Sequence, residues 1–203
     1  MGIQIIGRPN CDGQVLAGGK LLEIYPGSVM GRSNYALYAM YASDFDTAVT
    51  EATKVRELDP DYFKAWLPVA MKALAENDTA AALQAYDNMA RLSARAASTA
   101  SLGRADVALF EGRHEDAKRI LEDGIAADAA GGGYYAATKY MALAEAEIAA
   151  GDVAAALLAV SKGLELSSRD AQKVPAALMY IAAGELDRTL STATAVGRPI
   201  AAR

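Results

Sequence analysis

Among the chain's 203 residues, histidine and cysteine are scarce, and no recognisable catalytic pattern is present. His114 is the only histidine and Cys11 is the only cysteine. A histidine activates a nucleophile only when the nucleophile and an orienting carboxylate lie beside it. A single cysteine excludes an internal disulfide and a zinc site built on cysteines. We therefore predict that His114 is an ordinary packing or surface residue and that Cys11 has no function.

The segment 18–20 reads Gly-Gly-Lys, which is part of a phosphate-binding pattern. The full motif, G-x-x-x-x-G-K-[ST], needs a glycine five residues before the second glycine and a hydroxyl group after the lysine. Gln14 and Leu21 occupy those two places. The glycines at 131–133 suit a flexible loop better than a nucleotide cradle. The sequence therefore predicts no nucleotide site in either segment.

Acidic side chains are spread along the chain and do not form the pattern of a catalytic pair or of a metal site. Paired carboxylates can act as acid and base, and metal sites usually combine carboxylates with histidines. The pairs found here are better explained as solvated helix faces: Glu115, Asp116, Glu122, Asp123, Glu145 and Glu147. We therefore expect a protein that is not an enzyme and that binds no cofactor and no metal ion.

The overall charge and hydropathy narrow the possible partners. The net charge is −5, whereas a nucleic-acid surface needs clustered Lys and Arg to neutralise phosphates, so we expect no nucleic-acid partner. No uninterrupted apolar run approaches the roughly 18 residues of a membrane span, and the N-terminus lacks the pattern of a signal peptide. We expect a cytoplasmic location, with an exported part of a larger protein left open.

Alanine dominates the hydrophobic residues, which make up 53% of the chain. Alanine is the best helix former because it loses no side-chain entropy on folding. Alternating Val, Ile, Thr and aromatic residues, which favour strands, are scarce. Runs such as 80–82 and 154–156 therefore indicate helices that approach one another closely.

An internal repeat of about 34 residues organises the chain, and this period is typical of stacked helical units. Ala48 and Ala82 occupy equivalent places in similar segments, and so do Pro26 and Pro60. The segment recurs downstream with copies that end at Ala117, Ala156 and Thr189. An insertion around 131–133 explains the longer interval between the copies that end at 117 and 156. Each copy contains two helical stretches separated by a short turn of Gly, Asn or Asp.

The repeat predicts five antiparallel helix pairs: 30–42 with 46–58, 62–75 with 79–93, 97–111 with 114–128, 134–150 with 153–167, and 171–183 with 185–195. Gly112 and Gly151 suit the left-handed residue that ends a helix. Asp44, Asp78 and Asp152 suit the N-cap of the second helix. Residues 14–25 correspond to a second helix without its partner, which Gly18 and Gly19 weaken.

These copies resemble tetratricopeptide repeats, whose pattern is W-x₂-L-G-x₂-Y, then A-x₃-F, then P. The second copy carries it as Trp66, Ala73, Ala82 and Tyr86. The resemblance implies an all-α, right-handed solenoid of about four full repeats with partial repeats at each end. We expect residues 1–13 to be irregular, 14–196 to form the repeat domain, and 197–203 to be a tail.

A narrower resemblance covers 101–117 and 120–128. These segments are similar to the repeat region that follows the kinase domain in large bacterial Ser/Thr kinases of eukaryotic type. The kinase motifs themselves, the Gly-rich loop, His-Arg-Asp and Asp-Phe-Gly, are absent from this sequence.

Stacked repeats form an extended concave surface, and the resemblance implies that the first helix of each pair lines it. The residues expected there are Asn34, Leu37, Tyr41, Lys64, Leu67, Met71, Thr99, Asp106, Thr138, Met141 and Glu145. Packing inside the stack is an equal explanation for Leu37, Leu67 and Met141. Core packing is likewise the preferred explanation for Tyr134, Tyr135 and Tyr140.

The predicted function is a non-catalytic module that binds a peptide or a partner protein. Some tetratricopeptide domains hold a terminal carboxylate with Lys and Asn, but the corresponding slots here are mostly apolar or acidic, so no such clamp is expected. A mixed apolar and acidic groove favours a basic amphipathic partner. The alternative is a self-association or scaffold segment of a larger bacterial signalling protein, with homo-oligomers forming through exposed terminal repeats.

Overall fold

A computed structural model describes residues 11–130, 135–167, 169–194 and 196. Within these residues all regular structure is helical. The elements in chain order are α1 (Cys11–Ile24), α2 (Val29–Tyr41), α3 (Phe45–Leu58), the 3-10 helix η1 (Phe63–Trp66), α4 (Leu67–Ala75), α5 (Thr79–Ala90), α6 (Ala94–Phe110), α7 (His114–Ala130), α8 (Ala136–Ala150), α9 (Val153–Leu166), α10 (Asp170–Ala182) and α11 (Leu186–Thr194).

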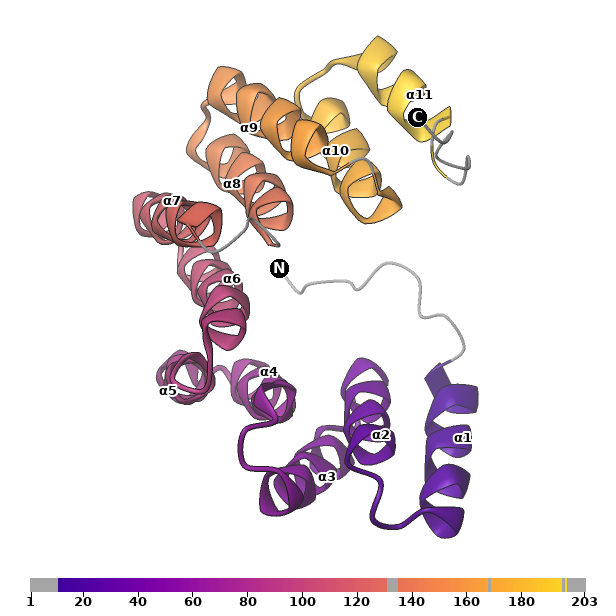
Figure 1. The fold of residues 1–203 in the computed structure, drawn as a ribbon. Helices are drawn as coiled ribbons and strands as arrows, with labels where there is room; N and C mark the ends of the chain where they lie inside the picture. Colours follow the sequence, from indigo (N-terminus) through magenta and orange to yellow (C-terminus); the bar gives the residue numbers. More distant parts are fainter. Residues whose placement is uncertain (1–10, 131–134, 168, 195, 197–203) are drawn as a thin grey trace. The chain divides into compact units, whose positions relative to one another are not determined.

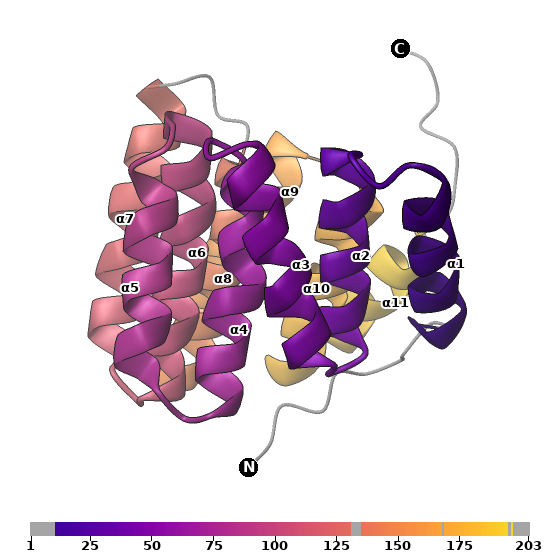
Figure 2. The same ribbon diagram turned by 90° about the horizontal axis from the view of Figure 1, so that it is seen from below.

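The chain forms two compact units, Met1–Ala100 and Ser101–Arg203, with the boundary inside α6. In the first unit, α2 packs on α3 and η1–α4 packs on α5, while α1 packs on α2 (Figure 2). In the second unit, α8 packs on both α7 and α9, and α10 packs on α8, α9 and α11 (Figure 1). The predicted all-α architecture of antiparallel helix pairs is confirmed. We call α2, η1–α4, α6, α8 and α10 the A helices, and α1, α3, α5, α7, α9 and α11 the B helices.

A left-handed residue follows every A helix. It is Ser43, Asn77, Gly112, Gly151 or Gly184, with φ between 60° and 87°. These five positions recur at the intervals of the sequence repeat, including the longer interval between Gly112 and Gly151. The left-handed conformation lets the chain reverse direction within about two residues. The turn therefore provides a common reference, and residues at the same distance from it are equivalent.

Aspartate caps begin three of the B helices. The side chains of Asp44, Asp78 and Asp152 accept hydrogen bonds from the backbone N–H three residues later, at 3.2, 2.9 and 2.9 Å. Each bond satisfies a donor that the first helical turn leaves free. These three predicted caps are confirmed. The third copy differs because Arg113 stands in this slot, between Glu111 at 2.5 Å and Asp116 at 2.7 Å.

Two helices start differently from the prediction. The A helix expected to begin at residue 62 starts as the 3-10 helix η1 and becomes α4 at Leu67. Pro68, at the start of α4, has no N–H to donate and is tolerated only in the first helical turn. Helix α1 begins at Cys11, before the expected Gln14.

Gly18 strengthens the contact between α1 and α2 rather than fraying α1. A Cβ atom at Gly18 would lie 2.8 Å from Cδ2 of Tyr35, so the absent side chain makes room for the tyrosine ring on α1. The Gly-Gly-Lys segment at 18–20 lies within helix α1, whereas the corresponding segment of a phosphate-binding motif forms a loop.

Small side chains fill the cores of both units. In the second unit, Leu121 and Val160 are fully buried among Ala105, Ala144 and Ala156. In the first unit, Ala52 and Val55 form one cluster and Ala39 and Ala48 form another. Alanine at these positions lets the helix axes approach closely, as the alanine-rich composition predicts.

Candidate protein-binding surface

One face of each A helix is accessible at most of its positions, although Pro68 and Gly103 on it are buried. This face consists of the residues that lie thirteen, nine, six and two positions before the left-handed turn residue of each copy. These positions follow the i, i+4, i+7, i+11 spacing of one helix side. We call this the A-face. All of the predicted surface residues except Leu67 and Met141 lie there, namely Asn34, Leu37, Tyr41, Lys64, Met71, Thr99, Asp106, Thr138 and Glu145.

In the first unit the A-face is mainly apolar and aromatic. Tyr41 is 50% exposed and Met30, one turn before Asn34, is 68% exposed. Leu37 and Met71 are half-buried and pack against the core formed by Ala39, Met40 and Ala48. This part of the face therefore combines exposed apolar groups with one cation, Lys64.

In the second unit the A-face carries negative charge. Asp106 on α6 and Glu145 on α8 occupy the same slot of successive A helices, and both are exposed. No hydrogen bond or ion pair joins either carboxylate to another of the described residues. Solvent reaches Asp106 at the surface, but the packed helices around it desolvate its carboxylate. This desolvation first, and the negative charge of Glu145 second, raise the pKa of Asp106 to about 6. The two carboxylates thus repel each other, and no counter-ion for them lies among the described residues.

Two predicted surface residues lie off the A-face. Leu67 and Met141 lie ten residues before the turn, one residue off the nine-residue slot, and so point to a different side of the helix. Met141 is 5% exposed and packs against Gly163 of α9, and Leu67 packs against the Met40 core. Met141 is therefore a core residue, in agreement with the packing explanation, whereas Leu67 is half-buried against the same core as Leu37 and Met71.

The sequence analysis missed three exposed apolar residues of the A-face. Phe110 follows Asp106 by one turn of α6 and is 56% exposed, and Leu178 occupies the slot of Asp106 and Glu145 on α10 and is 50% exposed. Met30 lies thirteen residues before its turn residue, as Lys64 does in the next copy. Counting from the turn in every copy, rather than in the clearest copies, would have found all three.

Other sequence candidates have structural roles. His114 is half-buried at the start of α7, in the slot that holds Phe45 and Thr79 in other copies. Tyr140 packs against the core of the second unit, with Nζ of Lys162 5.8 Å from the ring centre. Tyr135 is half-buried just before α8, whereas Tyr134 and the glycines at 131–133 lie outside the described residues.

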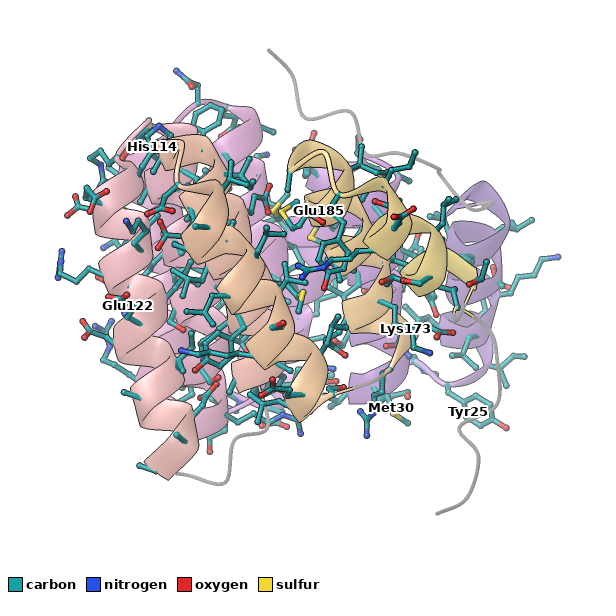
Figure 3. All side chains as sticks on the ribbon, turned by 90° about the horizontal axis from the view of Figure 1, so that it is seen from above. Tyr25, Met30, His114, Glu122, Lys173 and Glu185 are labelled. Carbon is teal, nitrogen blue, oxygen red and sulfur yellow. The ribbon has the colours of Figure 1, made fainter. Side chains whose placement is uncertain are left out.

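Glu147 corrects the prediction that the acidic pairs are all solvated. It is 6% exposed on α8, and Nζ of Lys118 on α7 lies 3.0 Å from its Oε2 atom. The carboxylate is buried because α7 packs on this side of α8, and the lysine compensates its charge. Glu122 follows the prediction, because it lies on the outward side of α7 (Figure 3).

Across the part of the chain that the structure describes, no three His, Cys, Asp or Glu side chains are grouped to hold a metal ion. No helix in the same residues is long and apolar enough to cross a membrane. A hollow of about 490 Å³ lies between α1 and α2, lined by Leu16, Lys20, Glu23 and Tyr35 among others.

Solved structures with the same fold are tetratricopeptide-repeat proteins and related helical-repeat proteins. A thermophilic protein of this type from Thermus thermophilus covers 91% of the chain and 90% of its own length, with a TM-score of 0.66 and 18% identity. The match to yeast Tom70 covers 91% of this chain and 39% of the Tom70 chain, with a TM-score of 0.71 and 15% identity. The match to the human IFIT1 dimer with PPP-AAAA covers 90% of this chain and 44% of the IFIT1 chain, with a TM-score of 0.58 and 15% identity.

No protein-family model and no curated protein sequence matches the chain. At 15–18% identity, the three likenesses establish the fold alone.

Proposed function

We propose that this chain, which has the fold of the tetratricopeptide-repeat proteins, is a non-catalytic module that binds a segment of another protein on its A-face. The observation that supports this most is the pair of carboxylates of Asp106 and Glu145, which have no ion-pair partner in the described part of the chain and lie beside exposed Phe110 and Leu178. Unpaired surface charges of one sign attract the opposite charge, and exposed aromatic and aliphatic groups add area to bury.

The partner segment follows from these contacts. It carries Lys or Arg to neutralise the two carboxylates and apolar residues about one helical turn away to cover Phe110 and Leu178. A basic amphipathic helix meets both requirements because residues three to four apart share one side.

A nucleic-acid ligand fits this face less well. The IFIT1 structure shows that a helical-repeat protein can be solved with PPP-AAAA, but phosphate binding depends on clustered cations. The A-face of the second unit presents two carboxylates in its central slot, which repel phosphates. We therefore favour a protein partner.

A peptide selection tests the proposal. A library of random peptides displayed on phage is selected on the immobilised wild-type protein, and the enriched peptides are measured by calorimetry. We expect peptides with Lys or Arg spaced three to four residues from Leu, Phe or Trp. The double variant Asp106→Lys/Glu145→Lys should bind them at least tenfold more weakly, about 1.4 kcal/mol, and raising the salt concentration should weaken wild-type binding.

The matched control reverses two charges outside the A-face. Glu122→Lys/Asp123→Lys, on exposed positions of α7, changes the net charge equally and should leave affinity within twofold. Enriched peptides without basic residues, or equal loss in both double variants, would remove the A-face from consideration. Binding of 5′-triphosphorylated oligoadenylate as tight as that of the peptides would replace the protein partner with RNA.

Self-association is the second candidate. It is motivated by exposed apolar residues at both ends of the described chain, including Ile24 at 68% and Ile181 at 61%. Light scattering over a hundredfold concentration range separates the two functions. A concentration-independent monomer that still binds the selected peptides supports the interaction module alone.

A further inference from the structure

The two carboxylates of the A-face belong to a row that crosses the A helices of the second unit. Asp106 on α6 and Glu145 on α8 lie six residues before their turns, and exposed Leu178 has the same position on α10. Helix α8 lies between α6 and α10 (Figure 1). We call these three residues the crossing row. It presents two negative charges followed by one aliphatic side chain.

A second row, of small or compact residues, runs beside the crossing row. Nine residues before the turn, α6 has Gly103, α8 has Ala142 and α10 has Pro175. Gly103 is buried and the other two are half-buried, so none of them projects far from its helix. The side chains at a helix contact determine how closely the two helices approach. A ligand can therefore come close to all three A helices beside the crossing row.

Only a ligand that crosses the A helices meets the whole crossing row. The accessible side of α8 carries a single carboxylate, that of Glu145. A partner helix aligned with α8 would neutralise this charge and leave Asp106 without a counter-ion. A partner helix in the furrow between α6 and α8 would meet both carboxylates but would leave Leu178 of α10 uncovered.

The distance between neighbouring A helices specifies the spacing of the partner's cations. Ala105 and Ala108 of α6 share a core cluster with Ala144 of α8, and α10 packs on α8. The axes of packed helices lie about 8–10 Å apart, and seven residues of an α-helix span about 10.5 Å. Residues seven apart also lie on nearly the same side of a helix. A helix laid across the A helices therefore places every seventh residue over the next member of the row.

The order of charges favours one direction for the crossing helix. An α-helix carries a partial positive charge at its N-terminus and a partial negative charge at its C-terminus. The carboxylates of Asp106 and Glu145 attract the N-terminal end, and Leu178 has no charge that would repel the C-terminal end. The partner helix therefore begins over α6 and runs toward α10.

Resting on the proposed function, we infer that the partner segment is an α-helix that crosses α6, α8 and α10, with Lys or Arg at two positions seven residues apart and an apolar residue seven positions further on. The first cation pairs with Asp106, the second pairs with Glu145, and the apolar residue covers Leu178. The general requirement for a basic amphipathic helix thus becomes a specific order of three residues along the partner.

Three synthetic peptides of identical composition test the spacing and the direction. Each contains two arginines and one leucine in a background of Ala and Gln, about 21 residues long so that a helix can form. The first peptide has Arg, Arg and Leu at intervals of seven, the second has its arginines four residues apart, and the third has the order Leu, Arg, Arg. In fluorescence anisotropy with the full chain, the first should bind at least tenfold more tightly than the second and at least threefold more tightly than the third.

Charge exchange tests which carboxylate meets which cation. Glu145→Lys should weaken binding of the first peptide at least tenfold. Replacement of the peptide's second arginine by glutamate should restore the affinity to within threefold, whereas replacement of its first arginine should not. Asp106→Lys should show the opposite pattern, with restoration only by glutamate in place of the first arginine.

The apolar end of the row has its own matched control. Leu178→Asp should weaken binding of the first peptide at least tenfold. Leu158→Asp, at a 57% exposed position of α9 outside the A-face, should leave the affinity within twofold. Circular dichroism and thermal melting confirm that each variant is folded before its binding is interpreted.

The outcomes separate this inference from the proposed function. Equal binding of the first two peptides, both weakened by Asp106→Lys/Glu145→Lys, would overturn the crossing arrangement and leave the A-face as the binding surface. Restoration of affinity in the exchanged order would overturn the direction. Failure of the first peptide to bind, while phage-selected basic peptides bind, would likewise refute the spacing alone. Binding of all peptides that the double charge reversal leaves unchanged would overturn both proposals.

Discussion

Nζ of Lys139 lies 2.5 Å from Oδ2 of Asp128, and the lysine side chain is completely buried between α7 and α8. A Cβ atom at Gly124 would lie 2.8 Å from Cε of Lys139, so the glycine provides the space through which the lysine reaches its partner. The pair joins two helices whose connecting residues include the insertion of the long repeat. The ion pair therefore links α7 and α8 at a buried point of their contact.

Removal of one member of this pair should be strongly destabilising. Asp128→Ala leaves a buried ammonium group without its main counter-charge, and we expect a loss of about 3–5 kcal/mol in the free energy of unfolding. The double variant Asp128→Leu/Lys139→Met, which leaves no buried charge, should lose much less. Urea denaturation followed by circular dichroism measures both. Equal losses in the two variants would show that the charge is not the cause.

The two glycines of α1 should respond oppositely to alanine. Gly19→Ala should stabilise the protein by about 0.5–1 kcal/mol, because alanine is the better helix former and the new Cβ would meet only Oη of Tyr35, at 3.9 Å. Gly18→Ala would press on the tyrosine ring and should be about 1–3 kcal/mol less stable than Gly19→Ala. Thermal melting of the pair measures the difference, and identical shifts would exclude the packing role of Gly18.

Loss of an N-cap should destabilise a B helix. Asp152→Ala removes the acceptor of the Ala155 N–H and should cost about 1 kcal/mol. Asp123→Ala, an exposed aspartate inside α7, makes no such bond and should stay within about 0.5 kcal/mol of wild type. The urea midpoints of the two variants provide the test. A loss of the same size at Asp123 would assign the effect to charge rather than to capping.

The raised pKa of Asp106 makes stability depend on pH. Its pKa is about 6 in the folded protein, against an ordinary value of 3.8. Between these values the folded chain retains a proton that the unfolded chain has lost, so this group lowers stability as pH rises through the window, and the full effect is present above the folded pKa. Solvent reaches Asp106, which reduces the size of the effect.

Asp106→Asn removes this titration. The stability of the variant relative to wild type should therefore rise from about pH 4 to about pH 7. Urea midpoints across this range, with Asp123→Asn as the control, measure the difference. A difference that is independent of pH, or that falls as pH rises, would contradict the raised pKa.

The structure also divides the predicted surface into two groups of residues. Asp106 and Glu145 could be assigned to one helix side from the repeat alone, because each lies six residues before its turn, and Thr138 lies seven residues before Glu145 on the same side. Met141 could not be excluded in that way, since a methionine suits either a surface or a core. Its contact with Gly163, on the following helix α9, places it in the core.

The helix pairs, the positions of their turns and three of the aspartate caps could be located from the amino-acid sequence alone. These features depend on residues close to one another in the chain, such as the left-handed Gly112 and Gly151 and the bond from the Ala155 N–H to Asp152. Local interactions of this kind repeat whenever the residues repeat, so the period of the repeat was sufficient to locate them.

Which sides of those helices are covered became clear only from their packing in three dimensions. Glu147 is buried while Glu145, two residues away, is exposed, and Ile181 is exposed while its equivalent Ile148 is half-buried. Both contrasts arise from helices that are distant in sequence: α7 lies against Glu147, and α10 packs on α8, where Ile148 lies. A residue's exposure depends on its neighbours in space, and residue type and helical period do not specify those neighbours.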